Sequence, residues 1–160
     1  MDVTITERMR WKAFEYDIAS AAGNLLAKKQ NFSFAHKLEI FSGESAVARI
    51  HAEPSFLHSR YRFILQDGRE YNFAREKVWT PIYACTGNGE TYSVTRHGHS
   101  SLSVFKNDHP IATIERPFSF WKNTEYKISM EGNADLLVVA CMVLTIRTIE
   151  QESEAPIIAR

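Results

Sequence analysis

One segment near the C-terminus limits the choice of fold more than any other part of the chain. LLVVACMVL, residues 136–144, contains no polar side chain, and Arg147 is the first charged residue after it. Several of its residues are β-branched and favour a strand locally. The apolar pattern nevertheless runs for about seventeen residues, and strands rarely exceed ten. We therefore predict a helix from Ala134 to Glu150, with Asn133 or Asp135 as its N-cap.

This segment is too short to cross a membrane. A spanning helix needs roughly 20 apolar residues to cross about 30 Å of hydrocarbon, whereas residues 136–146 would rise only ~16 Å as a helix. The segment also lacks the charged face of a helix that lies on a membrane surface. A helix that is apolar on all sides belongs inside a protein, so we expect no transmembrane segment.

The rest of the chain shows the two-residue alternation of strands that have one wet face. Tyr126, Ile128 and Met130, for example, alternate with polar residues. The Asp-Gly and Asn-Gly dipeptides at positions 67–68 and 88–89 are hairpin signals, because both central residues of such a turn need φ > 0. These signals predict roughly ten to twelve short strands, which is an all-β pattern.

The strands and the helix together predict one architecture. A closed sheet has no exposed edge strand, but a barrel of this many strands is too wide for its own side chains to fill. The apolar helix would fill that interior. We predict an all-β fold with one helix, a closed antiparallel β-barrel of about twelve strands around a buried hydrophobic C-terminal α-helix. Residues 1–150 would form this single domain, and residues 151–160 a flexible tail.

Charge and cysteine content exclude several classes of function. Lys+Arg and Asp+Glu number 19 each, so the chain has no overall field that would attract nucleic acid, and we predict no nucleic-acid partner. The two cysteines, Cys85 and Cys141, form neither a zinc pattern nor a disulfide framework, which suits a reducing compartment. The first residues include no apolar leader segment. We therefore expect a cytoplasmic protein.

Five segments of the chain follow one another in an order typical of a known family. They are GNLLAKKQ, KLEIFSGE, YRFILQDGREYNFARE, GETYSVTRHGHSSLSVFKNDHPIATIER and YKISMEGNADLLVVACMVLTIRTIE. In this order they resemble the LURP-one-related proteins, and the resemblance extends to the tubby C-terminal domain and the phospholipid scramblases. It covers roughly residues 18–150. It implies a closed antiparallel barrel threaded by a hydrophobic C-terminal helix, the same architecture that the residue pattern predicts.

The tubby branch of this resemblance implies a lipid-binding site. Tubby domains bind phosphoinositides through basic residues on the barrel surface, in part after a strand pair joined by an Asp-Gly turn. The similar segment here is FILQDGREYNFAREK, so the resemblance implies that Arg75 and Lys77, with Arg69 after the turn, bind an anionic headgroup at the membrane periphery. Glu70 and Glu76 interrupt the basic run, and a solvated strand edge of mixed charge is the alternative interpretation.

The scramblase branch implies calcium binding and acylation, and this chain departs from both. The segment MEGNAD before the predicted helix supplies only Glu131 and Asp135 as carboxylates, too few for the six to eight oxygen ligands of Ca²⁺. The chain also has no cysteine cluster. We therefore predict neither lipid transport nor a metal ion or other cofactor.

Candidate catalytic groups are few and scattered. His97 and His99 flank a glycine, but typical metal sites need three or four ligands, so we predict an exposed turn. Cys85 has no base near it in the sequence, as a nucleophile would require, and we interpret it as a small buried hydrophobe. These features predict a non-enzymatic binding module. The alternative is an enzyme that uses Cys85 or a histidine as its catalytic group.

Aromatic residues gather in the segment RPFSFWKNTEY. Phe118, Phe120 and Trp121, with Lys122 beside them, suit a loop that contacts a ligand, a membrane or another protein. Pro117 favours a second interpretation, in which this loop folds over the open end of the barrel. The predicted partners are thus an anionic phospholipid headgroup or a protein, the latter making the chain an interaction scaffold.

Overall fold

We describe the protein from a computed structural model. It describes residues 1–10, 13–30, 37–53, 60–77, 82–97, 100–116 and 125–158, and their side chains apart from those of residues 9, 10, 13, 30, 37, 77 and 151–158. The strands are β1 (Asp2–Arg10), β2 (Ala13–Ser20), β3 (Gly23–Gln30), β4 (Lys37–Ser42), β5 (Ser45–Glu53), β6 (Arg60–Leu65), β7 (Glu70–Lys77), β8 (Ile82–Gly87), β9 (Glu90–His97), β10 (Ser101–Lys106), β11 (His109–Glu115) and β12 (Glu125–Met130). The helix is α1 (Leu136–Ile158).

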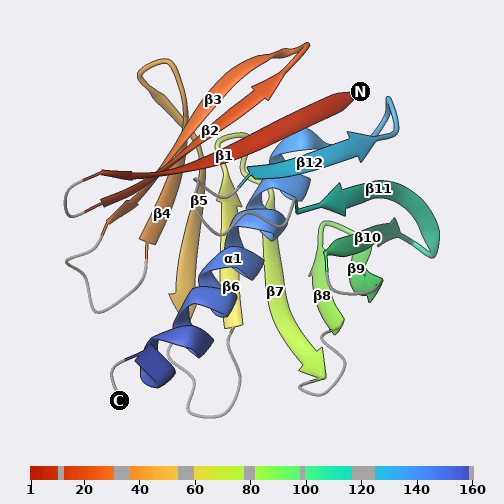
Figure 1. The fold of residues 1–160 in the computed structure, drawn as a ribbon. Coiled ribbons are helices and arrows are strands. Elements are labelled where there is room, and N and C mark those ends of the chain that lie inside the picture. The colour runs from red at the N-terminus through yellow and green to blue at the C-terminus, as the bar shows by residue number, and fades with distance from the viewer. Residues whose placement is uncertain are drawn as a thin grey trace.

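The strands form a closed barrel in which each pairs with its neighbours in the sequence (Figure 1). All these pairs are antiparallel. β1 pairs with β2 on one side and with β12 on the other, so the first and last strands close the sheet. This confirms the predicted fold class. The N-terminal residues, which precede the five segments that resemble the LURP-one-related proteins, also form strands of the barrel.

Alternate side chains of the strands point into the barrel. Tyr126 and Ile128 on β12 are buried, while the residues between them face outward, as the alternation predicts. Aromatic side chains from neighbouring strands meet inside. Phe73 of β7 stacks on Phe63 of β6 and on Tyr83 of β8, with both pairs of ring centroids 5.5 Å apart. Each strand therefore contributes one apolar face to a common core.

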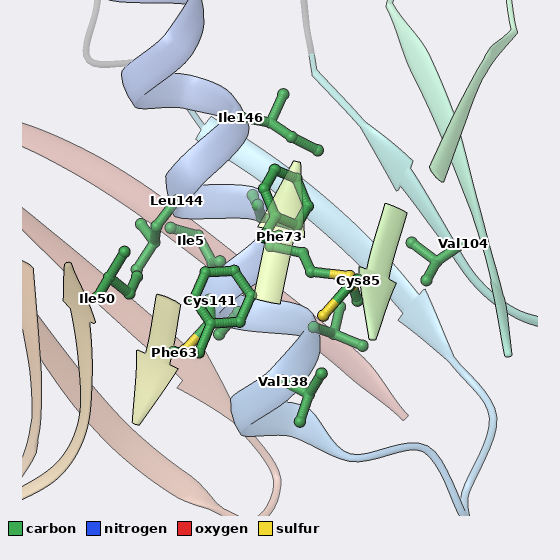
Figure 2. Close-up of a cluster of buried hydrophobic side chains, with 14 of the residues drawn as sticks. Ile5, Ile50, Phe63, Phe73, Cys85, Val104, Val138, Cys141, Leu144 and Ile146 are labelled. Atoms are coloured by element: carbon green, nitrogen blue, oxygen red, sulfur yellow. The ribbon is translucent and has the colours of Figure 1, made fainter. Parts of the chain in front are cut away.

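Helix α1 passes through the barrel and forms the centre of this core (Figure 1). Its side chains are at most 1% exposed over seven consecutive residues, which are Val138, Val139, Ala140, Cys141, Met142, Val143 and Leu144. Figure 2 shows side chains that leave the helix in different directions and approach residues of β1, β5, β6, β7, β8 and β10. The segment is apolar on all sides because the sheet surrounds it.

Asp135, one of the two predicted N-caps, caps the helix, which begins at Leu136 and not at the predicted Ala134. Its carboxylate accepts hydrogen bonds from the backbone N–H groups of Leu137 and Val138, at 3.0 and 3.3 Å. The helix continues to Ile158, beyond its predicted end at Glu150, so residues 151–158 are helical where the sequence predicted a tail. Extending a formed helix orders one residue for each hydrogen bond gained, and this costs far less than starting one. In the part of the chain described, no helix is long and apolar enough to cross a membrane.

The tight turns differ in one detail from their prediction. Asn88 and Gly89, between β8 and β9, both have positive φ, of 53° and 73°, as expected for an Asn-Gly hairpin. Between β6 and β7 only Gly68 does, with φ of 94°, so the expectation that Asp67 also has positive φ is wrong. The Asp67 carboxylate instead accepts a hydrogen bond from the backbone N–H of Arg69, at 3.0 Å. This side-chain bond stabilises a longer turn in which only the glycine needs the left-handed conformation.

Candidate functional site

The strand ends form two rims around the helix. We call the strand ends around Asp135, where the helix begins, the cap rim. The strand ends around Arg147 and Glu150, where the described buried part of the helix ends, are the exit rim. Because every strand is antiparallel to its neighbours, residues that are distant in sequence meet at each rim.

The structure divides the predicted lipid site between these two rims. Arg69 directly precedes β7 at the cap rim, while Arg75 and Lys77 lie at the far end of the same strand. The six residues from Arg69 to Arg75 span ~20 Å along an extended strand. The three predicted cations therefore do not form one cluster. The backbone of Lys77 ends β7 at the exit rim, and its side chain lies outside the description.

Arg69 connects the β6–β7 turn to the start of the helix. Its guanidinium bonds the carboxylate of Asp67 at 2.8 Å and that of Asp135 at 2.7 Å. It also donates to the Tyr71 hydroxyl at 3.3 Å. The hydrogen bond to Asp135 is the main reason that the pKa of Arg69 is raised above its ordinary value. Arg69 thus holds the N-cap residue in place, which is a structural role.

Glu90 gathers the remaining polar groups of the cap rim. Its carboxylate accepts a hydrogen bond from the Tyr92 hydroxyl at 2.6 Å and pairs with the Lys106 ammonium at 3.4 Å. The same ammonium lies 5.7 Å from the centroid of the Tyr92 ring. Both cations of this network, Arg69 and Lys106, have carboxylate partners. We therefore expect little affinity for a further anion at this rim.

A buried ion pair fastens the helix to β1 near the exit rim. The Arg147 guanidinium bonds both carboxylate oxygens of Glu7, at 3.0 and 3.3 Å, and the two side chains are only 14% and 9% exposed. Burial lowers the pKa of Arg147, but the hydrogen bond and charge of Glu7 outweigh it and raise the pKa overall. Removing one partner of such a pair typically costs about 3–5 kcal/mol.

A narrow hollow opens at the exit rim beside the helix. Its lining residues are Arg96, Ser100, Ser101, Leu102, Ile114, Arg116, Tyr126 and Glu150. The Arg116 guanidinium bonds the Glu150 carboxylate at 2.6 Å. The cavity volume is ≈ 20 Å³, room for about one water molecule. In its present state the hollow is therefore too small for a substrate or a whole lipid headgroup.

The Tyr126 hydroxyl is an unusual feature of this hollow. Tyr126 is 3% exposed. The Arg116 guanidinium lies beside its hydroxyl, and no acceptor for the proton of this hydroxyl is found among the described residues. Burial, and then the charge of Glu150, raise the pKa of Tyr126 to about 12. The hydroxyl therefore stays protonated at neutral pH and can donate a hydrogen bond.

Guanidinium groups outnumber carboxylates around this hollow. Arg75 and Arg96 both act on Tyr83: burial raises the pKa of Tyr83 most, and the two guanidiniums lower it in part. Arg75 therefore lies near the hollow, and it is the one predicted site residue whose described side chain does so. The charged residues that line the hollow itself are Arg96, Arg116 and Glu150.

Sequence reasoning did not find the other arginines of this cluster. Arg96, Arg116 and Arg147 stand on β9, after β11 and on the helix, and each has only one or no basic neighbour in the sequence. No local motif marks them, because the order of strands in the barrel brings them together. For Arg96 and Arg116, a position at or just after a strand end was the one available signal, since antiparallel strand ends meet at a rim.

Cys85, the predicted candidate nucleophile, lacks the lowered pKa that this chemistry requires. Cys85 is 0% exposed, and burial raises the pKa of its thiol to about 12, whereas a nucleophilic cysteine needs a lowered pKa. His97 ends β9, and Gly98 and His99 lie outside the described residues. Within the residues described, no group of three or more His, Cys, Asp or Glu side chains is placed to hold a metal ion.

The predicted contact loop, with Phe118, Phe120, Trp121 and Lys122, lies outside the described residues. Comparison with known proteins adds no assignment, since no family model, curated protein or solved structure matches the chain. The resemblance to the LURP-one-related and tubby proteins stays a prediction from the sequence motifs.

Proposed function

We propose that the protein is a non-catalytic binding module that recognises an anionic lipid headgroup at the exit rim of the barrel. The observation that carries this proposal is that two guanidinium groups, of Arg96 and Arg116, and one carboxylate, of Glu150, are the charged groups among the residues that line the hollow. The resemblance of the sequence to tubby domains, which bind phosphoinositides, supports a lipid as the source of the anion. Binding at the membrane periphery follows from this proposal.

The expected affinity for a membrane is modest. A cation near an anionic membrane surface contributes about 1 kcal/mol, and carboxylates of the same rim offset part of the arginine charge. The surplus of one guanidinium in the lining of the hollow is therefore worth roughly 1 kcal/mol. Binding of this strength should weaken steeply with added salt, because exposed charges are screened within about 10 Å at 0.1 M ionic strength.

Sedimentation with lipid vesicles tests this proposal. We expect the protein to sediment with vesicles of phosphatidylcholine that contain phosphatidylserine, and to stay in solution with phosphatidylcholine alone. Arg96→Glu should abolish most of this binding. Arg49→Glu is the matched control, because Arg49 is an exposed arginine in the middle of β5, away from both rims.

Two outcomes would contradict the proposal. One is an equal loss of binding in both variants, which would indicate a general charge effect rather than a site. The other is no binding to anionic vesicles at low salt. Binding to a protein instead would support the alternative of an interaction scaffold, and turnover of any substrate would support the enzyme alternative.

A further inference from the structure

Glu150 already places a carboxylate on the arginines of the hollow. One of its oxygens lies 2.6 Å from Arg116 and 4.0 Å from Arg147, on the same helix. The Glu150 side chain is 24% exposed, so solvent reaches it. A carboxylate supplied by the chain itself therefore stands at the place where an external anion would meet Arg116.

The hollow offers more hydrogen-bond donors than this carboxylate uses. The Arg96 guanidinium and the hydroxyls of Ser100 and Ser101 also line it. Tyr126 lines it as well, and its buried hydroxyl, which has the Arg116 guanidinium beside it, finds no acceptor for its own proton among the described residues. A buried polar group of this kind calls for an explanation, because nearly all such groups in native proteins have a partner. A ligand with several acceptor oxygens would supply the missing acceptor.

We infer that the hollow binds a single phosphate group and that Glu150 competes with this phosphate for Arg116. This inference rests on the proposed function and names the ligand chemistry of the same rim. A phosphate monoester carries about −1.5 to −2 charges and three strong acceptor oxygens, which suits two guanidinium forks and the nearby hydroxyls. A carboxylate has two oxygens and a single charge and would leave donors unused.

The size of the hollow is the reason that binding must be competitive. Its present volume of ≈ 20 Å³ holds about one water molecule, and a phosphate group is larger. The Glu150 carboxylate therefore withdraws from Arg116 as phosphate enters. Glu150 lies where the described buried part of the helix ends, so occupancy of the hollow also loosens a contact between the helix and the barrel.

Titration with inorganic phosphate, followed by calorimetry or by the NMR signals of the hollow, tests the competition. Glu150→Gln should bind phosphate at least about tenfold more tightly than the unmodified protein, the change expected when one competing charge-assisted hydrogen bond is lost. Arg96→Gln and Arg116→Gln should bind at least about tenfold more weakly. Arg49→Gln, on the outer face of β5, should bind like the unmodified protein.

Tyr126→Phe keeps the ring in the core and removes only the hydroxyl. It should weaken phosphate binding severalfold while changing the urea midpoint little, because Arg116, the described neighbour of the hydroxyl, keeps its bond to Glu150. The inference is overturned if Glu150→Gln and the unmodified protein bind phosphate equally. It is also overturned if both Arg96→Gln and Tyr126→Phe bind phosphate as tightly as the unmodified protein, with all of them folded.

Further arms identify the source of the phosphate. Glycerol 3-phosphate presents a soluble monoester, and vesicles with phosphatidic acid present the same group on a lipid. Tighter binding to phosphatidic acid than to either soluble ligand would favour a lipid source, and equal binding would favour a soluble one. Binding to phosphatidylserine vesicles that Glu150→Gln and Tyr126→Phe do not alter would retain the proposed function and reject the phosphate pocket.

Discussion

Gly87, at the end of β8, lies closer to the neighbouring strand than any side chain allows. A Cβ atom at this position would overlap the Glu70 carbonyl oxygen and touch the Tyr71 ring. Gly132, before the helix, has open space around its Cα. Neither residue has a positive φ, so the two glycines differ in packing space and not in this backbone restriction. They form a matched pair for measuring the cost of one methyl group.

Gly87→Ala should lower the free energy of unfolding by about 1–3 kcal/mol, because the β7 backbone must shift to admit the methyl group. Gly132→Ala should change it by less than about 0.5 kcal/mol. Urea unfolding followed by circular dichroism measures both values. Equal stability of the two variants would show that the barrel wall yields at Gly87, contrary to the packing described.

At the scale of elements, the helix is the part of the fold on which the others depend. Its side chains are buried up to Ile149, and its backbone continues as a helix to Ile158. The strands need this core, because a barrel of twelve strands encloses more space than its own side chains fill. The helix in turn needs the sheet, because apolar burial supplies most of the stability of a helix in a protein.

Two truncations separate the buried part of the helix from the rest. A chain that ends at Ser153 should keep nearly the same urea midpoint, because it retains every described buried side chain of the helix. A chain that ends at Met142 should lose cooperative unfolding, since it lacks Leu144, Ile146 and the Arg147–Glu7 pair. A cooperative transition in the shorter chain would show that the strands form a core without the helix.

At the scale of the whole molecule, the barrel buries tyrosine rings together with their hydroxyls. The pKa values of Tyr16, Tyr71, Tyr83, Tyr92 and Tyr126 are all raised, and burial is the largest cause for each. The net charge of the chain, which is near zero at pH 7, gives no hint of this property. It makes the folded state sensitive to alkali, because the unfolded chain loses these protons first.

The free energy of unfolding should therefore fall as the pH rises above about 10. For Tyr126, the stabilisation is fully present below the ordinary value of 10.0 and is lost between there and about 12. Each such tyrosine contributes a slope of about −1.4 kcal/mol per pH unit in its window. Urea midpoints measured across this range test the slope. Tyr126→Phe should make it shallower, and an unchanged slope in that variant would contradict the assignment.

The elements of this protein were predictable from local sequence, and the candidate site was not. Alternation of polar and apolar residues is a property of neighbouring positions, so it identified the strands, and the apolar run at residues 136–146 identified the core helix in the same way. Arg69 shows the limit of such reasoning: its motif suggested a ligand site, but Asp135, distant in sequence, binds it.

The sequence by itself determined that strands surround an apolar helix, because any arrangement that exposes this helix to water is unfavourable. Only the tertiary structure decided which charges meet. Arg96, Arg116 and Glu150 line one hollow because the closed order of strands brings their elements together at one rim. The physical reason is that the two kinds of information concern different neighbours. Hydrophobic periodicity relates residues that are close in the chain, whereas electrostatic pairing depends on distances in space that only the closed barrel sets.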